Sequence, residues 1–225
     1  MILTIRAIDD ADVLDALRAR IDRLEWRDGR ATAGATAKAV KRNLQAVLSG
    51  HAGEALHREL REIVANNPVV KAAAQPRRFS RLLVSRTEEE GHYGAHVDNA
   101  LMDRGEDRMR TDISFTLFLT PPGEYDGGEL MIHAAGMTQW VKPEAGDLVL
   151  YPSSSIHEVR PVTAGARIAC VGWIESWIAD GAQREMLFDL ENLRVSLRAS
   201  LPRQSAELLT LDKTIANLMR MWGRR

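Results

Sequence analysis

The stretch AGDLVLYPSSSIHEVRPVT, residues 145–163, decides the fold that the sequence predicts. Its first three residues have the small and polar character of a tight turn, and residues 148–151 form a short apolar run typical of a buried strand. The loop at residues 152–155 then delivers Ile156 and His157 into the next strand. A chain that folds back over so few residues predicts antiparallel sheet.

Short segments of the same kind fill the middle of the chain around this stretch. The predicted strands are RFSRLLVSR (78–86), TDISFTLFLT (111–120), GELMIHA (128–134), TQWVKP (138–143), DLVLYP (147–152), HEVRPVT (157–163) and ARIACVGWI (166–174). The predicted turns are PPGEYDGG (121–128), HAAGM (133–137), PEAGD (143–147) and TAGA (163–166). Many short strands at this spacing favour a sandwich or barrel over alternating βα units. We therefore predict an α+β fold with a double-stranded β-helix, or jelly-roll, core.

Both ends of the chain have helical periodicity instead. Helices are predicted over residues 8–26, 35–48 and 53–65, the last of them ended by Asn66-Asn67-Pro68. Beyond residue 178 the helical period returns on both sides of Pro202. The expected parts are N-terminal helices that support the core (1–77), the jelly-roll core (78–177) and a small C-terminal helical appendage (178–225). This appendage is expected to dock on the sheet or on another subunit, so a homo-oligomer is one expectation.

Composition and charge exclude several classes of function. Lys and Arg number 30 against 31 Asp and Glu, so the chain lacks the basic excess of a nucleic-acid-binding protein. No apolar run approaches the length of a membrane span, and the first residues do not resemble a signal peptide. Cys170 is the single cysteine, which rules out an intramolecular disulfide. A cytoplasmic protein that binds neither nucleic acid nor membranes is expected.

Three side chains can form a metal site. His96 and Asp98, in GHYGAHVDNA, are separated by one residue, so on an extended strand they point the same way. A sheet that folds back at residues 152–155 can bring His157 opposite them. Each of these residues alone is more often structural than metal-binding. Together, two histidines and one carboxylate make the facial triad of non-haem Fe(II) oxygenases, which leaves coordination positions open.

The other histidines are weaker candidates. His51 and His57 fall in a predicted helix, where a surface or capping role is favoured, and His133 ends a strand. His92 lies four residues before His96. On a strand this spacing puts the two side chains on the same face but about 13 Å apart, so His92 could line a pocket entrance.

Arg167 lies ten residues beyond His157 in an apolar strand. A buried guanidinium is costly unless a fixed anion meets it. Beside a facial triad, its natural task is a bidentate grip on the far carboxylate of a dicarboxylic cosubstrate. The alternative is an exposed arginine on an edge strand.

The set HVD, YDGGEL, AGDLVLYPSSSIHEVRPVT and GARIA resembles the bacterial PKHD-type hydroxylases, relatives of prolyl 4-hydroxylase that use Fe(II) and 2-oxoglutarate. The resemblance runs nearly end to end. It implies iron ligation by His96, Asp98 and His157, binding of 2-oxoglutarate by Arg167, and O2 as a further substrate, with ascorbate as an additional cofactor to test.

One position departs from the family. A tyrosine that helps to hold the cosubstrate usually lies nine residues before the first iron ligand, and here that position is Thr87. Thr87 is expected to keep a hydroxyl there on a shorter arm, and Tyr93 is expected to line the same pocket.

Two other interpretations stay open at this point. A cupin-like metalloenzyme that does not use 2-oxoglutarate, or a non-catalytic iron-sensing module, would need no counterpart of Arg167. The primary substrate is equally open: family members often occur beside iron uptake, which suggests a siderophore or related small molecule, whereas a peptidyl substrate follows only from the family's name.

Overall fold

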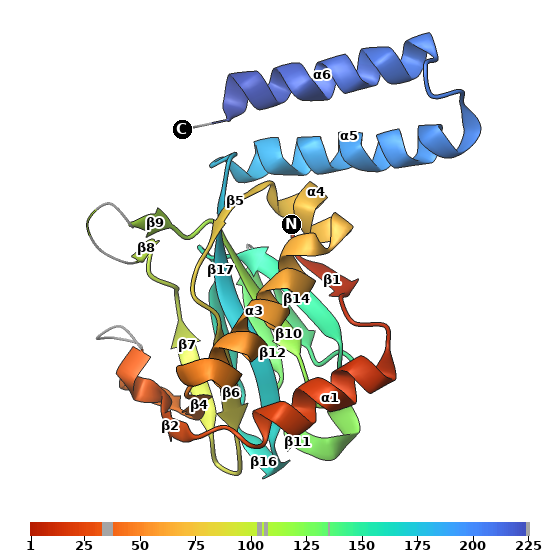
Figure 1. Cartoon of the computed structure of the whole chain (residues 1–225). Coiled ribbons are helices and arrows are strands. Elements are labelled where there is room, and N and C mark those ends of the chain that lie inside the picture. Colours follow the sequence, from red (N-terminus) through yellow and green to blue (C-terminus); the bar gives the residue numbers. More distant parts are fainter. Residues whose placement is uncertain (33–37, 103–104, 106–107, 135, 224–225) are drawn as a thin grey trace.

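Two antiparallel sheets face each other in the computed structural model, which describes residues 1–32, 38–102, 105, 108–134 and 136–223 (Figure 1). The main sheet has the strand order β1-β14-β10-β17-β6-β4-β2, with β5 paired to β17. The second sheet has the order β13-β12-β15-β7-β3. This pair of sheets confirms the predicted jelly-roll core.

The main sheet consists of β1 (Leu3–Arg6), β2 (Trp26–Asp28), β4 (Leu44–Ala46), β5 (Pro76–Phe79), β6 (Leu83–Thr87), β10 (Ile113–Phe118), β14 (Asp147–Pro152) and β17 (Arg167–Ser176). The second sheet consists of β3 (Lys41–Arg42), β7 (His92–His96), β12 (Leu130–Ala134), β13 (Met137–Val141) and β15 (Ile156–Val159). Two short ribbons pair β8 (Leu101–Met102) with β9 (Met109–Arg110) and β11 (Tyr125–Gly127) with β16 (Val162–Gly165). The helices are α1 (Ala11–Ile21), α3 (Gly50–Asn66), α4 (Pro68–Ala74), α5 (Gly181–Ser200) and α6 (Ala206–Trp222), with 3₁₀ turns η1 (Gly29–Thr32) and η3 (Pro122–Glu124).

The stretch at residues 145–163 carries the chain from one sheet to the other. The turn before β14 contains Gly146 with a φ of 92°, and a Cβ there would lie 2.5 Å from the Ile8 carbonyl oxygen, so only glycine fits. β14 pairs with β1 and β10 in the main sheet, whereas β15 pairs with β12 and β7 in the second. The fold-back predicted from the sequence is therefore a crossover between sheets, and it places His157 directly opposite His96.

Helices α1, α3 and α4 cover the outer face of the main sheet (Figure 1). Leu56, Leu60 and Val64 form the buried stripe of α3 at the spacing of helical turns. Asn67 ends α3 and begins α4, since its side chain accepts hydrogen bonds from the first N–H groups of α4. This packing holds the main sheet rigid behind the site.

The helix predicted over residues 35–48 is wrong from residue 39 onward, and residues 35–37 lie outside the described part. Lys41–Arg42 and Leu44–Ala46 are strands β3 and β4. β3 pairs with β7 and β4 pairs with β6, so these residues extend one edge of each sheet. The helix predicted to reach residue 26 also ends earlier, at Ile21, because Trp26 starts β2. Strand pairing with segments that are distant in sequence overrides the helical periodicity of these residues.

The predicted C-terminal helical appendage is confirmed, and its helices α5 and α6 form a hairpin (Figure 1). The hairpin has its own apolar cluster, built around Ile178, Leu187, Leu211 and Ile215, and α5 packs on α4. The hairpin therefore docks on its own chain. A homo-oligomer and the domain limits 1–77, 78–177 and 178–225 stay predictions. No helix in the described part of the chain is both long and apolar enough to cross a membrane.

Candidate active site

The three predicted metal ligands meet between the two sheets. His96 ends β7, His157 lies opposite it on β15, and Asp98 follows β7 by two residues. One potential ligand atom from each of the three lies within 4.8 Å of the others, and His157 Nε2 is 3.7 Å from Asp98 Oδ2. This spacing suits three ligands of one metal ion on a single face.

A β-bulge shapes this part of β7. His96 lies opposite His157 and Tyr93 lies opposite Val159, so three steps along β7 match two steps along β15. The extra residue turns both Tyr93 and His96 inward, and their rings stack with centroids 3.7 Å apart. Gly94 allows the bulge to pack on the N-terminal segment, since a Cβ there would lie 2.9 Å from Val40 Cβ.

Both imidazoles are oriented by backbone carbonyl groups. His96 Nδ1 lies 2.8 Å from the Gly94 oxygen, and His157 Nδ1 lies 3.1 Å from the Ser155 oxygen. A carbonyl oxygen can only accept, so each Nδ1 carries the proton and each Nε2 keeps the lone pair that binds a metal. Burial, together with the neighbouring His157, lowers the pKa of His96 to about 4. His96 is therefore neutral and ready to ligate at physiological pH.

Asp98 is positioned by a hydroxyl rather than by strand geometry. The prediction placed His96 and Asp98 on one strand, but β7 ends at His96. Ser114 Oγ on β10 donates a hydrogen bond to Asp98 Oδ2 (2.6 Å) and lies 2.8 Å from Ser153 Oγ. No local pattern in the sequence marks Ser114 or Ser153 as a support for Asp98, because both contacts join segments that are distant along the chain.

Arg167 lines the same cavity and is buried, with 2% of its surface exposed. Its guanidinium lies 4.8 Å above the Phe118 ring, and its stem packs where a Cβ on Gly128 would come within 3.1 Å. Nε and Nη2 have no hydrogen-bond partner in the described part of the chain. Burial lowers the pKa of Arg167. Such a group is costly to bury unless an anion completes it, so the far carboxylate of 2-oxoglutarate fits this part of the cavity.

Two residues with hydroxyl groups lie beside Arg167. Thr87, also 2% exposed, lies directly opposite Arg167 in the pairing of β6 with β17. The Tyr125 ring also lies beside Gly128, and its hydroxyl is buried without a partner among the described residues. Burial raises the pKa of Tyr125. Thr87 thus lines the cavity, as expected from the sequence. Tyr125 was not expected near the site, because residues 121–128 were predicted as a turn.

One cavity brings together all six residues named from the sequence. It is lined by His96, Asp98, His157, Arg167, Thr87 and Tyr93, and also by Lys41, Asn43, Gln45, Trp173 and their neighbours. Lys41, Asn43 and Gln45 come from the segment predicted as a helix, so their place in the site was missed. Trp173 also lines the cavity, and its Nε1 is buried without a partner in the described structure.

The remaining histidines lie elsewhere. His57 Nε2 accepts a hydrogen bond from the Leu82 backbone N–H (3.1 Å), in line with the predicted capping role. His133 Nδ1 pairs with the Thr138 hydroxyl, and His92 lines a neighbouring pocket.

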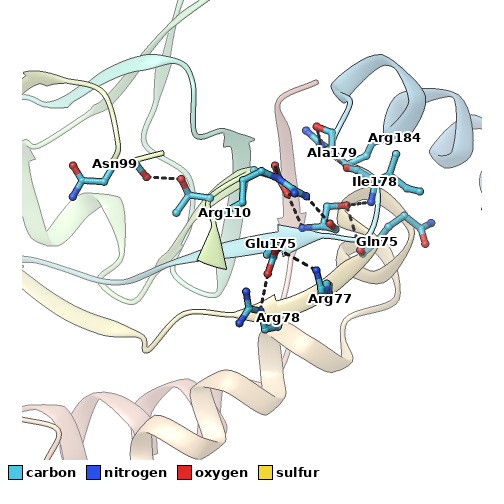
Figure 2. A network of polar contacts seen from close by, with 12 residues as sticks. Gln75, Arg77, Arg78, Asn99, Arg110, Glu175, Ile178, Ala179 and Arg184 are labelled. Atoms are coloured by element: carbon cyan, nitrogen blue, oxygen red, sulfur yellow. Dashed lines mark hydrogen bonds and ion pairs between the residues drawn. The ribbon is translucent and has the colours of Figure 1, made fainter. Parts of the chain in front are cut away.

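A polar network ties the Asp98 segment to the C-terminal hairpin (Figure 2). The Thr111 hydroxyl donates to the Asn99 carbonyl oxygen (2.5 Å). Arg110 forms a bidentate pair with Asp112 (2.6 and 2.8 Å), and Asp112 accepts from the Ser176 backbone N–H. At the other end of the network, Arg184 of α5 donates to the carbonyl oxygens of residues 178 and 179.

Glu175 belongs to this network and not to the cavity. It forms ion pairs with Arg77 and Arg78 (Figure 2), and it is not among the residues that line the cavity. This arrangement gives no support to a contact between Glu175 and a substrate in the cavity.

Comparison with known proteins gives two family matches. Residues 82–175 match the 2OG-Fe(II) oxygenase superfamily, and residues 181–223 match the PKHD-type hydroxylase C-terminal domain. A PKHD-type hydroxylase of Hyphomonas neptunium is 50% identical over 221 residues, 98% of this chain and 99% of that protein. A PKHD-type hydroxylase of Synechococcus elongatus is 47% identical over 99% of this chain and 100% of its own.

Solved structures share the fold at lower identity. A prolyl-4-hydroxylase of Pseudomonas putida superposes with a TM-score of 0.54 at 22% identity, covering 78% of this chain and 92% of that one. A prolyl hydroxylase of Trichoplax adhaerens, solved with a hypoxia inducible factor peptide fragment, gives a TM-score of 0.60 at 15% identity, covering 78% and 83%.

Proposed function

The chain belongs to the PKHD-type hydroxylases of the 2OG-Fe(II) oxygenase superfamily, and we propose from this that the His96, Asp98 and His157 side chains hold its iron. It is an Fe(II)- and 2-oxoglutarate-dependent hydroxylase, which consumes O2 and a substrate of its own. Bound Fe(II) supplies the activation of O2 that couples conversion of 2-oxoglutarate to succinate and CO2 with insertion of one oxygen atom into a C–H bond.

The protein's part in this chemistry is to position groups. The carbonyl groups that face both Nδ1 atoms aim the Nε2 lone pairs at one point, and Ser114 fixes the Asp98 carboxylate beside them. Three ligands on one face leave room for the cosubstrate and O2 on the other. In related halogenases a small residue takes the place of the carboxylate, so the presence of Asp98 favours hydroxylation.

Arg167 is the residue that we assign to 2-oxoglutarate. The observation that carries this assignment is its burial with two nitrogen atoms lacking a partner in the described part of the chain, in the cavity that holds the triad. The Thr87 hydroxyl, directly opposite, serves as the second anchor in place of the usual tyrosine. Tyr93 stacks on His96 and so restrains that ligand rather than the cosubstrate.

The test is anaerobic addition of Fe(II) and then 2-oxoglutarate to metal-free protein, followed by visible spectroscopy. The wild type is expected to develop the weak charge-transfer band of chelated 2-oxoglutarate, and Arg167→Leu is expected to need far more cosubstrate for the same band. Arg160→Leu is the matched control, because Arg160 is about half exposed and pairs only loosely with Glu158. A band that is unaffected by Arg167→Leu would remove the assignment and favour a cupin-like or iron-sensing protein.

A further inference from the structure

A strip of polar side chains enters the cavity from β3 and β4, and it supplies none of the three proposed metal ligands. Lys41, Asn43 and Gln45 alternate along an extended segment, so they share one face, and all three line the cavity. Lys41 is 7% exposed and Gln45 is 4% exposed. Since β3 pairs with β7 and β4 with β6, the strip closes the edge of the cavity between the two sheets.

Lys41 lies close to the iron ligands. It is directly opposite Tyr93 in the pairing of β3 with β7, and its Nζ lies 4.8 Å from the centre of the Tyr93 ring. The Tyr93 ring stacks in turn on the His96 ring. An ammonium group is thus buried within the same wall as the metal centre, although lysine is seldom buried. The next residue, Arg42, faces outward, with 62% of its side chain exposed and an ion pair to Glu90.

The charges of the cavity lining favour an anionic guest. Among the described residues that line it, the cationic side chains are Lys41 and Arg167, and the carboxylate is Asp98. Once Fe(II) and dianionic 2-oxoglutarate are bound, the ion, Asp98, Arg167 and the cosubstrate together carry no net charge. The lining then stays positive by one, through Lys41. Burial lowers the pKa of Lys41 to about 8, so at pH 7 the ammonium form still predominates.

A second donor lines the same cavity. Trp173 lies opposite Ser114, the residue that holds Asp98, and its indole Nε1 is buried without a partner in the described part of the chain. An indole N–H can only donate. The cavity therefore offers an ammonium and an N–H donor to whatever binds beside the iron, and an oxygen-rich molecule matches both.

We propose that Lys41, Asn43 and Gln45 recognise the primary substrate, and that this substrate is a small organic molecule whose carboxylate or other anionic oxygen group binds the Lys41 ammonium. The proposal rests on the proposed function, because the charge balance assumes that iron and 2-oxoglutarate occupy the same cavity. Arg167, the other cation among the described residues of the lining, is then reserved for the cosubstrate.

The test compares small carboxylic acids with their own carboxamides as ligands. Protein loaded with Zn(II), which is diamagnetic, and saturated with 2-oxoglutarate is titrated with a library of such pairs by ligand-observed NMR. Wild-type protein is expected to bind acids at least about 10-fold more tightly than the matching amides, because the amide cannot pair with an ammonium. In Lys41→Met this preference is expected to vanish.

Arg42→Met is the matched control, since it removes the same charge from the neighbouring residue on the outer face. It is expected to keep the wild-type preference. Equal binding of acids and amides by the wild type, the absence of any bound acid, tighter binding of uncharged short peptides, or an unchanged preference in Lys41→Met would each overturn the proposal.

The Fe(II) and 2-oxoglutarate band, measured on the same variants, separates this proposal from the proposed function. Lys41→Met is expected to keep the band while losing the preference for acids, which supports the strip with the iron chemistry intact. Loss of the band in the wild type would count against the proposed function, whatever the acids do.

Discussion

His96 and His157 lie directly opposite each other on adjacent antiparallel strands, with ring centroids 4.3 Å apart and their planes tilted by 49°. Each ring turns its Nδ1 toward a carbonyl group of the residue two positions before it, so the two Nε2 atoms converge. The remaining ligand, Asp98, has no strand to fix it and depends on Ser114. The consequences can be measured one residue at a time.

Removing the carboxylate should abolish the reaction. Asp98→Ala is expected to lose succinate formation and to bind Fe(II) at least about 10-fold more weakly, because two imidazoles alone hold the ion poorly. Anaerobic titration with Fe(II) and a succinate assay give both values. Asp126→Ala, in an exposed position on β11, is the control. Wild-type succinate formation by Asp98→Ala would refute the metal site.

Removing the hydroxyl behind the carboxylate should weaken iron binding without removing a ligand. Ser114→Ala is expected to lower Fe(II) affinity about 10- to 100-fold, the usual effect of losing a group that orients a metal ligand. Ser154→Ala, at an exposed position in the same serine run as Ser153, is the control. Equal affinities in the two variants would show that Asp98 needs no support from β10.

The bulge should tolerate no side chain at Gly94. Gly94→Ala places a Cβ 2.9 Å from Val40 Cβ, so either β3 or the bulge must shift. The free energy of unfolding should fall by about 1–3 kcal/mol, as for other overpacked sites. Urea denaturation measures it, with Gly123→Ala as control because a Cβ there meets nothing within 4 Å. A variant as stable as the control would mean that the contact relaxes freely.

Metal-free protein should lose stability in mild acid. The pKa of His96 is about 4 in the folded protein and near 6.5 when unfolded, so the unfolded chain binds more protons between these values. The free energy of unfolding is therefore expected to fall as the pH drops from about 6.5 toward 4, by on the order of 1 kcal/mol for this partly buried group. Urea titrations at pH 7 and pH 5 test this, and His96→Gln should show a smaller difference. An equal difference in both proteins would assign the effect to other groups.

The sequence predicted those parts of the site that depend on residue type and order. His157 follows a turn, a strand and a loop, each with a local signature, and these sufficed to place it opposite His96. Arg167 could be assigned because a charge in an apolar strand demands an explanation whatever the fold.

The parts of the fold and the site that the sequence did not predict depend on contacts between segments that are distant along the chain. Val40, Leu44 and Val47 repeat at a helical spacing, and only pairing with β6 and β7 makes their segment extended. The contact between Ser114 and Ser153 likewise arises from packing, which no local pattern encodes. The same holds for the Tyr125 hydroxyl, which is buried without a partner among the described residues.

The segment of β3 and β4 passes from one sheet to the other, and it separates substrate recognition from iron chemistry along the chain. The oxygenase match spans residues 82–175 and includes every proposed iron and cosubstrate residue, whereas the strip at Lys41, Asn43 and Gln45 lies outside it. Substrate selectivity can then change without any change in the residues that bind iron and the cosubstrate. Replacing residues 41–45 with those of a relative should change which substrate the enzyme accepts and leave its iron-dependent reaction unchanged.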